Sequence, residues 1–215
     1  TYHRRMNADG PRPEGPQGPR PDRPRGPWSF AAFRRIFIAR AVSSAGSYMQ
    51  IVAATWYAFH TTGDAASVGI LTALALGPAL VGSPIGGALA DRFEPRRLAM
   101  ALSTLQGLSA TGMALLAWTG QLSMGWLYLL VLAGAIPFSL NQPVITLVVP
   151  YTVPPEYRQS ALARSSMMFN ITRLGGAVAG GFMVQWLGVA AGFAVNAATY
   201  FLVALVLAVT PLASD

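Results

Sequence analysis

The sequence predicts an all-α membrane protein that crosses the bilayer six times, and two observations support this. The 215 residues are 53% hydrophobic and 11% charged, whereas soluble domains carry about a quarter charged residues. From Ile36 onward, apolar runs close to or above the ~20 residues needed to span the hydrocarbon core alternate with short charged connections. We expect a transmembrane bundle over 33–211, with helices at about 33–60, 67–90, 98–119, 125–149, 160–187 and 189–210.

Several classes of function are disfavoured by composition. Cysteine is absent, and the two histidines, His3 and His60, lie far apart, so neither a metal site nor another cofactor is expected. No nucleophile–base pair indicates an enzyme. The net charge of +7 raises the question of nucleic acid, but the arginines stand where a membrane protein needs anchors. The expected environment is therefore the lipid bilayer of the cell membrane.

The first 32 residues form a predicted tail. Between Gly10 and Pro27 the chain has seven prolines, four glycines and four arginines and lacks aliphatic side chains. Such a segment buries too little apolar surface to offset the entropy of ordering, so we expect disorder on the cytoplasmic side.

Arginine placement predicts the orientation. Arginines occur in the tail, in the connection near 91–97 and in the connection near 150–160, whereas the three alternate connections have none. Because positive residues favour the cytoplasmic side, the N-terminus is predicted to be cytoplasmic. Proline interrupts some spans, as at Gly77–Pro78, which neighbouring helices in a membrane protein can tolerate.

The turn after the second span concentrates charge. Asp91 follows Gly87 by four residues and precedes Arg92, Arg96 and Arg97. A carboxylate there can accept hydrogen bonds from a neighbouring helix N-terminus, and the arginines can pair with carboxylates or lipid phosphates. One interpretation is a latch that keeps the cytoplasmic side shut. The other is a topological anchor alone.

This turn resembles the loop 2–3 signature of the major facilitator superfamily: the residues Gly87 to Arg97 read GALADRFEPRR. The segment Ser43 to Gln50, SSAGSYMQ, is similar to helix 1 of the exporter branch that includes enterobactin and macrolide efflux proteins. The resemblance covers roughly residues 30–210. It implies that the six spans form the N-terminal half of a two-half transporter, with substrate bound between halves near the midplane. The remaining half would be a missing C-terminal segment or a second chain.

Glycines in the fifth span resemble the superfamily's antiporter signature. They are Gly175, Gly176, Gly180 and Gly181. Small residues spaced by four allow close helix packing. The resemblance implies that this helix packs against the second half and seals the outer side, which favours export; packing alone is the simpler interpretation.

Polar side chains within the spans are candidates for the substrate pathway. They are Arg40, Ser47, Gln50, Asn141, Asn170 and Arg173. Arg173 lies too deep in its span to reach the interface, and a mid-membrane arginine normally faces a cavity or a partner. Ser166, Asn170 and Arg173 share a face by their spacing, which we expect to line the cavity. A structural arginine capping backbone carbonyls is the alternative.

The resulting functional hypothesis is a secondary active exporter of amphipathic small molecules, such as siderophores, antibiotics or metabolites. It would work by alternating access and use an ion gradient, because the chain has no nucleotide-binding loop and no lysine to complete one. The spans hold no acidic residue, so this half offers no obvious proton carrier. The alternative is a non-transporting, half-sized membrane module for interaction or assembly.

Overall fold

Helices make up nearly all of the structure. The computed structural model describes residues 26–210, which form helices and turns and include no strand. The long helices are α1 (Ala31–Thr62), α2 (Ala65–Leu76), α3 (Ala79–Arg92), α4 (Pro95–Trp118), α5 (Met124–Val148), α6 (Arg158–Leu187) and α7 (Val189–Val209). Three short 3-10 helices are η1 (Pro27–Ser29), η2 (Val149–Thr152) and η3 (Pro155–Tyr157). The prediction of an all-α membrane fold is confirmed.

The second expected helix, 67–90, is two helices in the structure. α2 ends at Leu76 and α3 begins at Ala79, with Gly77 and Pro78 between them. The Gly77 amide still donates to the Ala73 carbonyl at 2.7 Å. Pro78 has no N–H to donate, and a proline ring crowds the carbonyl four residues earlier, so the helix is interrupted here.

The expected boundary of the tail also shifts. Residues 1–25, which hold most of the proline-rich segment, lie outside the described residues. The folded part begins before residue 33, because Trp28 packs edge-on against Phe33 and Phe37, with ring centroids 5.7 and 4.8 Å apart. Arg34 donates from Nη1 to the Trp28 carbonyl at 2.8 Å and fixes η1 on the start of α1.

The turn between α1 and α2 follows from two residues. Gly63 adopts a left-handed conformation with φ 66°, which glycine accepts without a Cβ clash, and ends α1. Asp64 then caps α2, because its side chain accepts a hydrogen bond from the Ala66 amide at 2.9 Å.

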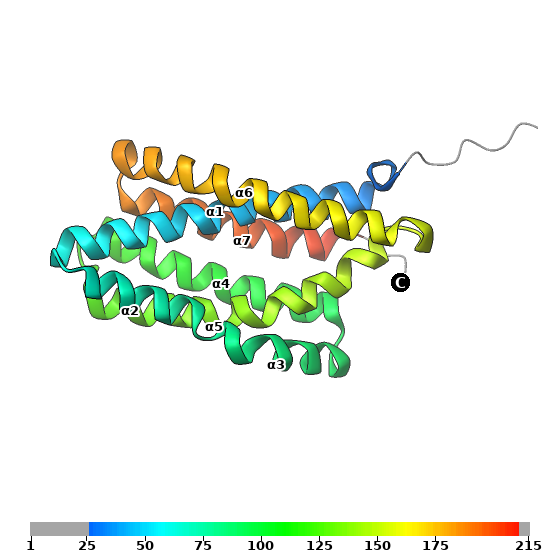
Figure 1. The fold of residues 1–215 in the computed structure, drawn as a ribbon, viewed down its shortest axis with the longest axis horizontal. Coiled ribbons are helices and arrows are strands. Elements are labelled where there is room, and N and C mark those ends of the chain that lie inside the picture. Colours follow the sequence, from blue (N-terminus) through cyan, green and yellow to red (C-terminus); the bar gives the residue numbers. More distant parts are fainter. Residues whose placement is uncertain (1–25, 211–215) are drawn as a thin grey trace, which may run out of the picture.

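The helices form two packed groups (Figure 1). α1, α6 and α7 pack together on one side, while α4 and α5 pack together with α2 and α3 against α5 on the other. The pairing of α4 with α7 and of α1 with α2 joins the groups. Small residues permit the close approaches: a Cβ added at Gly86 would lie 2.4 Å from the Leu140 carbonyl oxygen of α5.

The two ends of the bundle differ in charge. The start of α1, the turn between α3 and α4, the connection from α5 to α6 and the end of α7 lie at one end (Figure 1). The turns between α1 and α2, between α4 and α5 and between α6 and α7 lie at the other. Arginines populate connections at the first end and are absent from those at the second, where Trp118 and Trp186 are exposed.

Within the described residues, five helical stretches are long and apolar enough to cross a membrane. These are Ala31–Thr62, Ala65–Gly82, Pro95–Trp118, Met124–Thr152 and Val189–Val209. α6 is long enough at 30 residues but too polar to be counted with them. Its arginines and glycines therefore need an explanation from packing and from the site.

Candidate functional site

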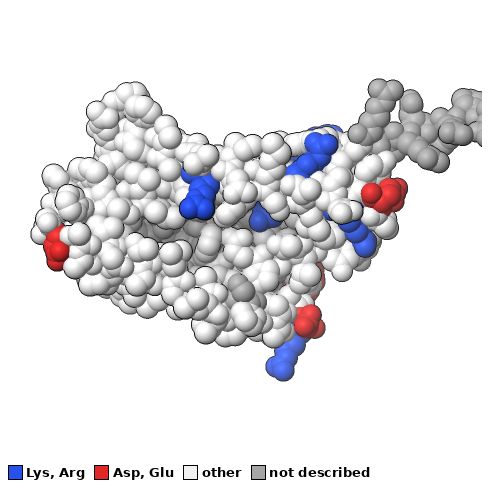
Figure 2. Space-filling view, viewed as in Figure 1, with Lys and Arg blue, Asp and Glu red and all other residues white. Residues whose placement is uncertain are grey.

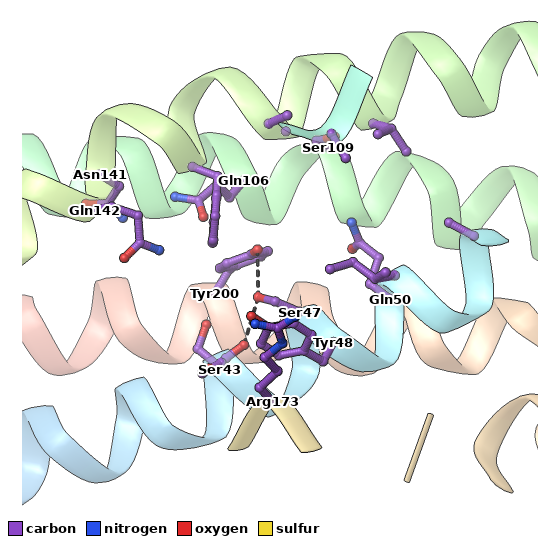
Figure 3. Close-up of a pocket in the computed structure, with 18 of the residues that line it drawn as sticks. Ser43, Ser47, Tyr48, Gln50, Gln106, Ser109, Asn141, Gln142, Arg173 and Tyr200 are labelled. Carbon is purple, nitrogen blue, oxygen red and sulfur yellow. Dashed lines mark hydrogen bonds between the residues drawn. The ribbon is translucent and has the colours of Figure 1, made fainter. Parts of the chain in front are cut away.

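A half-open cavity of about 540 Å³ lies between the two helix groups. Six helices contribute to it: α1, α2, α4, α5, α6 and α7. Figure 3 shows the α1 and α6 side carrying Ser47, Tyr48 and Arg173, opposite Gln106, Asn141 and Gln142 from α4 and α5. The lining is amphipathic, with hydroxyl and amide groups among aromatic and aliphatic side chains. Five of the six predicted pathway residues line it: Arg40, Ser47, Gln50, Asn141 and Arg173.

The polar side chains of α1 that line the cavity, Ser47 and Gln50, are held in place by hydrogen bonds to α7. Ser47 Oγ lies 2.9 Å from both the Ser43 carbonyl and the Tyr200 hydroxyl. A serine hydroxyl has one hydrogen, so donation to the carbonyl leaves Tyr200 as the donor to Ser47. Gln50 Oε1 accepts from Asn196 Nδ2 at 2.8 Å. These bonds orient one wall of the cavity before any ligand arrives.

Asn141 belongs to the opposite wall. Its Nδ2 donates to Ser103 Oγ of α4 at 3.1 Å, and the residue is 7% exposed. Its Oδ1 is buried and has no hydrogen-bond partner among the described residues. A buried acceptor without a partner costs free energy, of order 1–3 kcal/mol, so a hydrogen-bond donor brought to this atom would offset that cost.

Arg173 faces the cavity midway along α6. Its guanidinium lies 5.9 Å from the centroid of the Tyr48 ring, a cation–π distance. Tyr48 in turn stands edge-on to Phe169, with centroids 6.1 Å apart. The alternative role of capping backbone carbonyls is not seen, since no hydrogen bond joins Arg173 to another described residue.

Asn170, the sixth predicted pathway residue, is not among the residues that line this cavity. Its side chain is exposed and donates to the Ser166 carbonyl at 3.0 Å on its own helix. The cavity side of α6 is formed by Met168, Phe169 and Arg173 instead. At about 100° per residue, Asn170 lies roughly 60° around the helix from Arg173, on the side away from Phe169.

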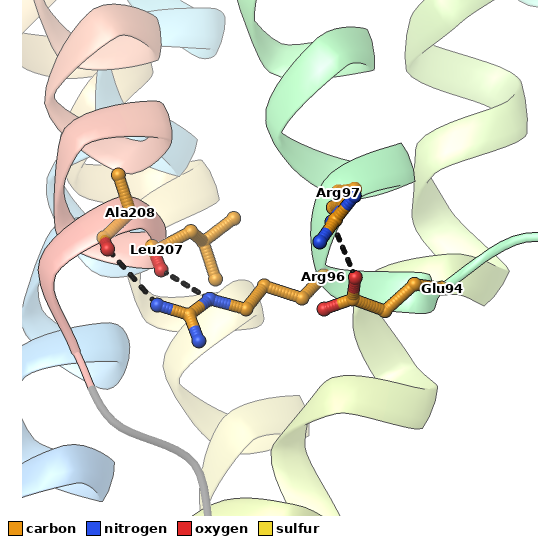
Figure 4. A network of polar contacts seen from close by, with 5 residues as sticks. All are labelled: Glu94, Arg96, Arg97, Leu207 and Ala208. Atoms are coloured by element: carbon orange, nitrogen blue, oxygen red, sulfur yellow. Dashed lines mark hydrogen bonds and ion pairs between the residues drawn. The ribbon is translucent and has the colours of Figure 1, made fainter. Parts of the chain in front are cut away.

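The charged turn makes its contacts through arginine (Figure 4). Arg96 donates from Nε to the Leu207 carbonyl at 2.8 Å and from Nη2 to the Ala208 carbonyl at 2.9 Å. These carbonyls end α7 and have no amide partner within that helix, and a cation favours the negative end of the helix dipole. Arg97 pairs with Glu94 at 2.6 Å on the exposed surface.

Asp91 stands apart from those bonds. It lies exposed in the last turn of α3, with Gly87 and Gln142 beside a shallow surface pocket against α5. Neither its carboxylate nor the exposed Arg92 guanidinium bonds to another residue within 26–210. The expected capping of a neighbouring helix N-terminus by Asp91 is therefore not seen in this part of the chain.

The four glycines of α6 divide into two pairs. A Cβ at Gly176 would lie 2.6 Å from the Ala45 carbonyl oxygen, and one at Gly180 would lie 2.8 Å from the Met49 Cα, so both pack on the α1 backbone. Gly175 and Gly181 are exposed and would meet nothing within 4 Å. The close packing thus joins α6 to α1 inside this bundle.

Sequence reasoning missed Gln106 and Tyr200, both of which line the cavity. A signal existed on α4, where the cavity-lining Ser103, Gln106 and Ser109 recur every three residues within an apolar span. Nothing local marks Tyr200, because its role depends on α7 lying beside α1.

Comparison with known proteins agrees with this architecture. The profile of a major facilitator family described as transmembrane secretion effector matches residues 23–214. The enterobactin exporter EntS of Shigella dysenteriae serotype 1 (strain Sd197) is 28% identical over 180 residues. The enterobactin exporter EntS of Escherichia coli O1:K1 / APEC is 28% identical over 183 residues. Each alignment covers 84% of this chain and 43% of the relative, so the chain spans less than half the length of these proteins.

Proposed function

The chain belongs to the transmembrane secretion effector family of the major facilitator superfamily, and on that premise we propose that it forms the N-terminal half of a secondary active exporter. It is a multi-pass protein of the cell membrane. The cargo would be an amphipathic small molecule, for which a siderophore is one candidate because the similar proteins are named enterobactin exporters. The proposed role is transport without catalysis.

The observation that carries this proposal is the cavity between the helix groups. Its volume of about 540 Å³ falls within the ~300–1,000 Å³ typical of small-molecule sites. Arg40, Ser47 and Gln50 from α1 and Asn141 from α5 all line it, with Ser47 and Asn141 on opposite sides (Figure 3). A second six-helix half, contributed by further sequence or another chain, would cover the open side, and rocking of the halves would give alternating access.

The proposed orientation places the N-terminus and the turn between α3 and α4 in the cytoplasm. The arginine-rich end of the bundle supports this orientation, because cationic connections are retained on the cytoplasmic side. There the exposed Asp91 carboxylate is available to the second half, and Arg96 holds the turn against α7. The turn would thus close the cytoplasmic side. Asp91 would be the group that binds the second half in the closed state and releases it when that side opens.

An efflux assay tests the proposal. A pump-deficient bacterial strain expressing the gene that encodes this chain is loaded with a panel of siderophores and antibiotics, with and without a protonophore. We expect lower accumulation of at least one compound, reversed by collapse of the ion gradient. We expect Asp91→Asn to abolish efflux with membrane insertion unchanged, and the matched variant Glu94→Gln to keep it.

Two results would contradict the proposal in different ways. Equal accumulation of every compound with and without the gene would remove the export function. Wild-type efflux by the Asp91→Asn variant would leave export standing but remove Asp91 from the mechanism.

A further inference from the structure

The cavity carries charge of a single sign. Among the residues that line it, Arg40 and Arg173 are charged, and none is Asp or Glu. Within helices α1 to α7 the one acidic residue is Asp91, at the end of α3 and outside this cavity. In Figure 2, cationic groups lie midway along the bundle as well as at its end, and no acidic group accompanies them there.

Neither cavity arginine has an anionic partner within residues 26–210. Arg40 is half-buried and makes no hydrogen bond or ion pair there, and Arg173 makes none either but lies over the face of Tyr48, 5.9 Å from the ring centroid. Two arginines outside the cavity do have partners: Arg34 and Arg158 donate to the carbonyls of Trp28 and Pro150. An arginine held inside the membrane is costly unless a partner or water-filled cavity compensates it.

The opposite wall offers an acceptor. Asn141 Oδ1 is buried and unpartnered, and its residue is 7% exposed and lines the same cavity. A bound molecule that satisfied it would have to present a hydroxyl or N–H group. Phe138, Phe169 and Tyr48 also line the cavity and supply apolar contact. The cavity therefore fits a molecule with an anionic end, an apolar body and a hydrogen-bond donor.

We propose that the cavity binds an amphipathic organic anion, whose carboxylate, phenolate or similar group is held by Arg40 and Arg173 and whose donor group reaches Asn141. Guanidinium groups form charge-assisted, often bidentate hydrogen bonds with such anions. This assignment rests on the proposed export function and specifies the class of its cargo.

A matched pair of probes tests the assignment directly. Dansyl-phenylalanine has a free carboxylate, and dansyl-phenylalaninamide differs by replacing that charge with a neutral amide. Binding of each to the full-length gene product in phosphatidylcholine nanodiscs is followed by dansyl fluorescence. We expect the carboxylate to bind about tenfold more tightly, which corresponds to about 1.4 kcal/mol. This comparison uses the wild-type protein and does not depend on a variant that folds.

Variants locate the site. We expect Arg40→Gln and Arg173→Gln each to weaken carboxylate binding about tenfold and leave amide binding unchanged, with Arg173→Lys retaining part of the preference. Arg35→Gln on α1 and Arg164→Gln on α6 are the matched controls, because both arginines lie on the same helices but outside the cavity. Neither control should alter the affinity for either probe.

Three outcomes would overturn the inference. Equal affinity for the two probes would mean that the cavity does not select an anion, whether because a carboxylate of the second half already pairs with the arginines or for another reason. Equal weakening by the control variants would place the effect outside the cavity. Weaker carboxylate binding in discs containing phosphatidylglycerol, at matched ionic strength, would assign the arginines to acidic lipid headgroups. Each result leaves the export test above unaffected, so the two proposals fail separately.

Discussion

The contact between α6 and α1 makes a sharp prediction for Gly176→Ala. The added Cβ would lie 2.6 Å from the Ala45 carbonyl oxygen and 2.9 Å from the Ala45 Cα, which are backbone atoms that cannot rotate away. Ordinary contact begins at 3.4 Å, so the two helices would have to separate by about 0.8 Å. Overpacking of this kind typically costs ~1–3 kcal/mol, and we expect a loss of that size in the free energy of unfolding.

The assay is unfolding of the purified protein in mixed detergent micelles, followed by tryptophan fluorescence, since Trp186 lies on α6. Gly175→Ala is the control one residue away: its Cβ would meet nothing within 4 Å, and alanine is the better helix former by ~0.8–1 kcal/mol in water. That variant should be as stable as the original or slightly more so. Equal stability of the two variants would refute the claim that Gly176 sets the approach of α6 to α1.

Three further predictions follow from single contacts. Arg96→Ala removes two hydrogen bonds to the carbonyls that end α7 and should speed amide hydrogen exchange in its last turn by about tenfold, whereas the exposed Arg92→Ala should not. Tyr200→Phe loses a 2.9 Å bond to the α1 serine and should cost about 0.5–1.5 kcal/mol of unfolding free energy, measured in the same micelles. The 215 residues contain no cysteine, so a single introduced cysteine can report the topology. An impermeant maleimide should label Phe93→Cys only from the cytoplasmic side of the membrane and Gln121→Cys only from the outer side. The reverse pattern would show that the topology is inverted.

The α1 wall of the cavity could be predicted from sequence because its pattern is local. Arg40, Ser47 and Gln50 stand at helical spacing in an otherwise apolar span, and all three line the cavity. The position of Asn170 outside this cavity has a physical cause. Residues three and four apart share a face, but periodicity does not say which edge of that face meets the cavity, and the long Arg173 side chain reaches it where Asn170 cannot.

Other features depend on neighbours that are distant in sequence. Tyr200 joins the site because α7 packs beside α1, and Gly176 is buried because the α1 backbone crosses it at Ala45. The sequence identifies the charged turn at 91–97. It does not show which residues Arg96 contacts, because its hydrogen bonds to the end of α7 join residues more than a hundred positions apart. Local pattern thus identifies which residues are unusual, and tertiary packing decides what they touch.

The interruption at Gly77–Pro78 forms a candidate hinge between α2 and α3, which have different roles. α2 contributes Leu71, Thr72, Ala75 and Leu76 to the cavity wall, while α3 carries the charged turn and is anchored to α5 through Gly86. Because Pro78 removes a backbone hydrogen bond, the chain bends more easily here than in an uninterrupted helix. Flexing there would let the cavity wall adjust to a large bound molecule while the charged turn keeps its position.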